Sequence, residues 1–158
     1  MPEGPPVEGV VPVWIAGVPG ATSVAFVEET GGTLVSTREG QLHHLAEPIG
    51  GPGEVVLDLA DRVATDGQEQ GMFAVAIAKD GRHLYLSFTA AGDGALTILE
   101  YAVADGLPDP DTERLVMEIP QPGVTHNGGQ LVTDDSGDAV DQRGRRRGRA
   151  VRRSRGVG

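Results

Sequence analysis

The sequence predicts an all-β fold, a partial β-propeller of about two blades and the start of a third. The chain holds 24 Gly and 11 Pro among 158 residues, which favours many short strands joined by tight turns. The turn glycines Gly32, Gly81 and Gly137 lie 49 and 56 residues apart. A repeat of this length with about four strands is typical of propeller blades. A β-sandwich with coincidental spacing is the alternative.

The repeat is a short apolar strand, a polar turn with glycine, and a second strand of small and β-branched residues. The third copy opens at 129–132, has its turn at 134–137 and then stops. Because propellers close at about four to eight blades, such a chain is too short to form a ring by itself. The strands expected in the two complete copies cover residues 23–27, 33–37, 41–45, 73–77, 83–88 and 95–101.

Charge and composition divide the chain into a flexible segment over 1–12, a propeller part over 13–140 and an Arg/Gly-rich tail over 141–158. Residues 1–140 hold 5 Lys and Arg against 22 Asp and Glu, a net charge of −17. This acidic body should not bind nucleic acid or anionic lipid. Residues 141–158 hold 8 Arg against one Asp, a net charge of +7.

The tail is predicted to be disordered, because it repels itself and offers little apolar surface to bury. Three interpretations stay open: a basic arm with non-specific affinity for nucleic acid, an inert solvated tail, and sequence read in a shifted frame. Elsewhere, cysteine is absent and no apolar run is long enough to span a membrane. The first residues lack the basic start and apolar middle of a signal peptide.

Two polar turns carry the candidate chemistry. The first is Gly67-Gln68-Glu69-Gln70-Gly71, and the second is Thr125-His126-Asn127-Gly128-Gly129. Both precede the first strand of a repeat, and such turns converge on one face of a propeller. We therefore expect Glu69 and His126 to share one site, where an imidazole suits proton transfer near neutral pH. The pair His43-His44 is not expected to bind metal, because neighbours on a strand point to opposite faces.

Taken in order, these motifs resemble the soluble pyrroloquinoline-quinone-dependent sugar dehydrogenases, the glucose/sorbosone dehydrogenase family. The segment from Glu69 to Ile77 is similar to the family's Glu/Gln-x-Gly-Leu-Leu-Gly strand. The segment from His126 to Leu131 is similar to its His-x-Gly-Gly-x-Leu motif, and 84–89 to its strand ending in an aromatic residue and Thr. The likeness runs from about Val13 to Gly137.

The resemblance implies a six-bladed propeller that oxidises an aldose at its anomeric carbon. The quinone cofactor would accept a hydride and His126 would take the hydroxyl proton. Glu69 would face the sugar, with Gln70 beside it and Asn127 as a further binding residue. In this family calcium is bound by residues of later blades, so no metal ligand is assigned in this chain. The family is typically periplasmic or extracellular, but the compartment of this chain stays unassigned.

The chain departs from the family pattern in two places. Met72-Phe73-Ala74 stands where Leu-Leu-Gly is usual, a tolerable packing change. After Val140, the Arg-rich run replaces the strands that should complete the third blade. We therefore expect the chain as written to be catalytically inactive. The alternative function is a non-catalytic, propeller-like interaction module.

Overall fold

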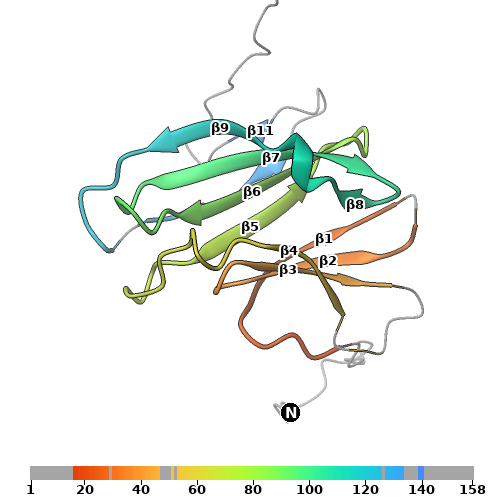
Figure 1. The fold of residues 1–158 in the computed structure, drawn as a ribbon, viewed down its shortest axis with the longest axis horizontal. Coiled ribbons are helices and arrows are strands. Elements are labelled where there is room, and N and C mark those ends of the chain that lie inside the picture. Colours follow the sequence, from red (N-terminus) through yellow and green to blue (C-terminus); the bar gives the residue numbers. More distant parts are fainter. Residues whose placement is uncertain are drawn as a thin grey trace, which may run out of the picture.

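The computed structural model describes residues 16–28, 30–46, 51, 53–125, 127–133 and 139–140. Two antiparallel sheets pack against each other, and a short strand pair lies beside the second (Figure 1). The first sheet contains, in spatial order, β1 (Ala21–Phe26), β2 (Thr33–Thr37), β3 (Gln41–Leu45) and β4 (Glu54–Asp58). The second has five strands: β5 (Met72–Ile77), β6 (His83–Thr89), β7 (Leu96–Ala104) and the short β8 (Leu107–Pro108) in order, with β9 (Arg114–Ile119) also paired to β7. The short pair is β10 (Val132–Thr133) with β11 (Ala139–Val140).

The four strands of the first sheet form one propeller blade, the four longer strands of the second form another, and β10 with β11 begins a third, so the predicted all-β partial propeller is confirmed. The described residues form no α-helix. The chain leaves β7 through a two-residue hairpin, in which Asp105 and Gly106 have φ of 52° and 79°. Positive φ at both positions is the type I′ geometry that Asp-Gly favours. The hairpin leads through β8 (Leu107–Pro108) and the 3₁₀ turn Pro110–Thr112 into β9.

The outer strands β4 and β9 were not predicted individually, although four strands per repeat were expected. Both lie at sheet edges, and most of their side chains are exposed or only half-buried. An outer strand therefore lacks the clear alternation of apolar and polar residues that marks a half-buried strand. The first repeat differs in one detail as well, because its left-handed turn residue is Gly31, with φ of 70°, rather than Gly32.

The main core lies between the two blades, and β6 shows how the sequence builds it. Leu84, Leu86 and Phe88 alternate along the strand, and all are buried in the core that the blades share. The intervening Tyr85 belongs to a second cluster on the other face of the blade. Because successive side chains on a strand point to opposite faces, β6 contacts the first blade on one side and the start of the third on the other.

The innermost strands β1 and β5 share an irregularity near their starts. The register of β1 shifts between Ala21 and Ser23, and that of β5 shifts between Met72 and Ala74. A bulge of this kind turns side chains away from the regular alternation. In β5 the shifted residue is Phe73, whose ring lies against Gly129 in the loop before β10.

Some of the sequence predictions concern residues outside the described ranges: the 1–12 segment, Gly137, His126 and the 141–158 tail. Among the residues that the structure covers, none forms a helix with the length and apolar character needed to cross a bilayer.

Candidate functional site

The candidate site lies where the innermost strands begin. Main-chain hydrogen bonds bring together the loops at this end of the two blades. The Met72 amide donates to the Arg38 carbonyl at 3.0 Å, which joins the β2–β3 turn to the start of β5. The Ala91 amide donates to the Arg62 carbonyl at 2.9 Å, which joins the β6–β7 turn to the loop between the blades. The segment 59–71 is therefore held by its neighbours on both blades.

Arg38 is the principal side-chain support of this loop. Its Nε donates to the Gln70 carbonyl at 3.0 Å. Its Nη2 donates to the carbonyls of Thr65 and Gly67, both at 2.7 Å. One guanidinium from the first blade thus binds three main-chain oxygens of the loop that enters the second blade. Such charge-assisted bonds are stronger than bonds between neutral groups.

Glu69 and Gln70 have different environments within this loop. Glu69 is exposed, whereas only 7% of Gln70 is accessible to solvent. The Gln70 side chain folds back onto its own turn, because its Oε1 accepts a hydrogen bond from the Gly67 amide at 2.8 Å. Glu69 is therefore the better placed of the two to meet a ligand, while Gln70 stabilises the turn that presents it.

Asn127 joins the loop before β10 to the loop before β5. Its Nδ2 donates to the Glu69 carbonyl at 3.3 Å and to the Val124 carbonyl at 3.1 Å. The residue is 3% exposed, and its buried Oδ1 has no hydrogen-bond partner. A buried amide oxygen without a hydrogen-bond donor carries a desolvation cost, which an ordered water molecule would offset.

The close approach of this loop depends on Gly129. Its φ is 131°, and a Cβ there would lie 2.5 Å from Cδ2 of Phe73. The Gly129 carbonyl accepts a hydrogen bond from the buried Ser87 hydroxyl on β6. Glycine is required here for both its φ and its lack of a Cβ, since a side chain would strain the backbone and push the loop off the second blade.

Three of the four residues predicted for the site therefore come from loops that lie side by side: Glu69, Gln70 and Asn127. His126 lies outside the described residues, and its role stays a prediction. Sequence reasoning missed Arg38. Its partners follow it by 27 to 32 residues, and nothing in the local run Thr37-Arg38-Glu39-Gly40 indicates that the guanidinium turns toward them.

The opposite end of the blades carries a separate feature, a cavity of about 320 Å³ at the ends of β1 and β5. Val27, Ile77 and Ala78 are among its apolar lining residues, and Glu28 and Asp80 are among its acidic ones. Glu69, Gln70 and Asn127, the predicted site residues that the structure describes, do not line it. The cavity is therefore distinct from the candidate site.

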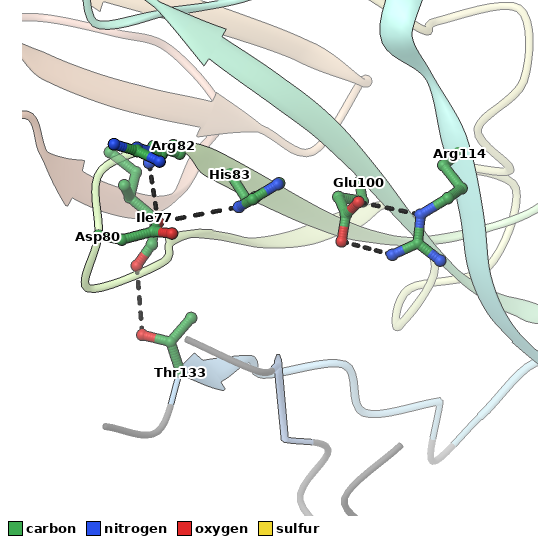
Figure 2. A network of polar contacts seen from close by, with 7 residues as sticks. All are labelled: Ile77, Asp80, Arg82, His83, Glu100, Arg114 and Thr133. Atoms are coloured by element: carbon green, nitrogen blue, oxygen red, sulfur yellow. Dashed lines mark hydrogen bonds and ion pairs between the residues drawn. The ribbon is translucent and has the colours of Figure 1, made fainter. Parts of the chain in front are cut away.

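A polar network crosses the outward face of the second blade near this end (Figure 2). The Glu100 carboxylate pairs with Arg114, with the closest atoms 2.6 Å apart. Burial raises the pKa of Glu100, but hydrogen bonds from Arg114 and Tyr85 outweigh it and hold the pKa below its usual value. Thr133 of β10 donates to the Ile77 carbonyl at 3.2 Å and thereby attaches the third blade to β5.

The two histidines of β3 are half-buried, and a ring nitrogen of each, Nδ1 of His43 and Nε2 of His44, has no hydrogen-bond partner. In the part of the chain that is described, no group of three or more His, Cys, Asp or Glu side chains is placed to hold a metal ion.

The chain can be compared with known protein families and with solved structures. No family model matches the sequence. Several solved structures are similar to the chain, among them the following three. A glucose dehydrogenase from Thermus thermophilus shares 22% identity at a TM-score of 0.62, over 79% of this chain and 37% of its own. A second glucose dehydrogenase shares 25% identity at a TM-score of 0.61, over 78% and 40%. The soluble aldose sugar dehydrogenase of Escherichia coli shares 26% at a TM-score of 0.56, over 72% and 34%.

These likenesses confirm the resemblance to soluble sugar dehydrogenases that the ordered motifs predict. The chain spans 34 to 40% of the length of these solved structures.

Proposed function

We propose that this chain is part of a quinone-dependent dehydrogenase that oxidises an aldose at its anomeric carbon. The observation that carries the proposal is the hydrogen bond from the Asn127 side chain to the Glu69 carbonyl at 3.3 Å. It places the two motifs of the sequence resemblance at one end of neighbouring blades. The likeness to glucose and aldose sugar dehydrogenases supports the same function.

The proposed roles follow from exposure and chemistry. The exposed Glu69 carboxylate accepts hydrogen bonds from sugar hydroxyls, which carry the donors that a carboxylate needs. Gln70 holds the turn beneath it through the bond to Gly67. Asn127, the further residue proposed for binding, holds the Glu69 loop through its Nδ2. His126, next to Asn127 in the sequence, is the proposed base for the hydroxyl proton, because imidazole titrates near neutral pH.

The described residues fit the sugar better than they fit the cofactor. Pyrroloquinoline quinone, which accepts the hydride when bound, carries carboxylates and therefore needs cationic partners. The two arginines near this end are already engaged, Arg38 with main-chain carbonyls and Arg62 with Glu113. Within the described ranges no acidic cluster is suited to calcium either. We therefore derive no step through the quinone, and its partners and those of calcium are proposed to belong to other blades.

A binding experiment on the 158-residue chain tests the proposal without requiring turnover. Saturation-transfer NMR with glucose should detect an aldose contact that Glu69→Gln weakens several-fold. The matched control is Asp80→Asn, which removes an exposed carboxylate at the opposite end. Equal loss in both variants, or absence of any glucose signal, would contradict the sugar site and favour the non-catalytic interaction module.

A second measurement concerns activity. Supplied with quinone, calcium and glucose, the chain is expected to reduce no redox dye, because two blades and the start of a third cannot enclose a cofactor. Turnover that His126→Ala abolishes would show that this expectation is wrong and would at the same time support His126 as the base.

A further inference from the structure

We infer that Arg38 is a positioning residue for the candidate site: from the first blade, its guanidinium sets the main-chain conformation that presents Glu69 on the second. The functional meaning of this inference rests on the proposed sugar site. The structural part does not, because it concerns only how the 65–70 loop is held.

The first observation is that two consecutive carbonyls are held by side chains from two different blades. The Gln70 carbonyl accepts a hydrogen bond from Arg38 at 3.0 Å, and the Glu69 carbonyl accepts one from Asn127 at 3.3 Å. Two successive peptides are therefore held: the start of the third blade holds the Glu69–Gln70 peptide, and the first blade holds the Gln70–Gly71 peptide. The Glu69 side chain is exposed between these two attachments.

The second observation is the geometry of the guanidinium. Nε binds one carbonyl and Nη2 binds two more, those of Thr65 and Gly67, at 2.7 Å each. A planar fork with fixed donor directions suits three oxygens that converge from different parts of a loop. A lysine ammonium, as a point charge on a flexible stem, cannot replace that fixed geometry.

The third observation is the space reserved for Arg38. Gly71 has a φ of 146°, and a Cβ there would lie 2.7 Å from Cγ of Arg38 and 2.9 Å from its carbonyl oxygen. The chain leaves the polar turn through a glycine because the arginine stem passes there. The absence of a side chain at Gly71 thus leaves the space that the Arg38 side chain needs to reach the loop.

Amide hydrogen exchange of the full chain tests the inference. Arg38→Ala removes the three side-chain bonds but keeps the main-chain bond from the Met72 amide to the residue 38 carbonyl. Exchange at the Gly67 and Gln70 amides should become about tenfold faster or more, because bonds to charged donors are lost. Amides of β2 and β6 should keep their wild-type rates. Arg82→Ala is the matched control, since Arg82 lies in the turn at the opposite end.

Chemical rescue separates positioning from general support. Methylguanidinium added to Arg38→Ala should restore slow exchange at Gly67 and Gln70 by occupying the three carbonyls, and methylammonium should restore less. Should Arg38→Ala fail to fold, Arg38→Lys provides the comparison, and it should show intermediate exchange confined to the loop. Acceleration spread equally over both blades, or unchanged exchange in the loop, would overturn the inference.

The sugar experiment keeps the two proposals distinguishable. Local loosening in Arg38→Ala together with weaker glucose binding supports both. Local loosening in a chain whose wild type binds no glucose would leave Arg38 as the residue that holds the loop and remove the proposed sugar site.

Discussion

The side-chain amide of Asn127 donates a hydrogen bond to the main-chain carbonyl of Glu69, 58 residues earlier in the chain. This bond joins the loop that enters the third blade to the loop that enters the second. It explains how two short polar turns, far apart in sequence, come to lie at one place. It also changes the interpretation of Asn127, whose amide nitrogen holds main-chain atoms and whose oxygen is buried.

Replacing Asn127 with Asp should therefore destabilise the chain. A carboxylate cannot donate to the carbonyls of Glu69 and Val124, and its charge would be buried beside them. We expect the free energy of unfolding to fall by about 1 to 3 kcal/mol, measured by urea denaturation. Gln68→Glu serves as the control, because it makes the same change of chemistry at an exposed position of the neighbouring turn. Equal stability of the two variants would mean that the Asn127 bonds contribute nothing.

Substituting Gly129 with Ala should be more damaging than an ordinary glycine substitution. The new Cβ would meet the Phe73 ring, and the backbone has a φ of 131°, where residues with side chains are strained. We expect a loss of about 2 to 4 kcal/mol, combining backbone strain with overpacking. Gly92→Ala is the matched control, since a Cβ there meets nothing within 4 Å. Thermal unfolding of both variants would reveal the difference, and similar melting temperatures would refute it.

Acid should weaken a polar contact formed by Glu113. Arg62 binds both of its carboxylate oxygens, at 2.7 and 3.0 Å, and the Tyr101 hydroxyl donates to Oε2 at 2.6 Å. The hydrogen bonds from Arg62 are the main cause that lowers the pKa of Glu113 below its usual value of 4.5. A lowered pKa in the folded state stabilises the fold above pH 4.5, and this stabilisation is lost as the pH falls below 4.5 toward the folded-state value.

Glu113→Gln should therefore reduce the acid sensitivity of folding. Because the carboxylate is about one-third exposed, solvent screening limits the effect to about 1 kcal/mol or less. Urea unfolding between about pH 6 and about pH 3 should show a flatter decline in the variant than in the wild type. Glu118→Gln, an exposed position on β9, the strand that follows Glu113, is the control. A decline as steep in Glu113→Gln as in the wild type would rule out this contribution.

Deleting residues 141–158 should leave the melting temperature nearly unchanged. The segment contains eight Arg and little apolar sequence, so it has little to bury. The deletion should also remove any affinity for nucleic acid, which would be non-specific and would fall steeply with added salt. Differential scanning fluorimetry and a salt-dependent binding assay test the two parts. A large loss of stability on deletion would show that these residues pack as part of a blade.

The inner architecture of this protein could be predicted from its sequence alone. The repeat of about 50 residues and the short apolar runs, such as 83–88, predicted blades, because a strand that is buried on both faces reads as a nearly continuous run of apolar and small residues. The polar turns before β5 and before the third blade were likewise predicted, from their glycines and from their matching positions in successive repeats. The outer strands β4 and β9 were not predicted individually, because edge strands are largely exposed and are not constrained by burial on both faces.

How the site is held, in contrast, depends on the packing of the blades. The local sequence around Arg38 predicts only a solvated turn residue. Its role becomes visible in the tertiary structure, where three carbonyls of the loop that enters the next blade accept hydrogen bonds from its guanidinium. The same holds for Gly71 and Gly129, whose need for glycine comes from Arg38 and Phe73 rather than from their own turns. Local sequence sets periodicity and turn chemistry, whereas contacts between blades depend on distances that no short stretch of sequence encodes.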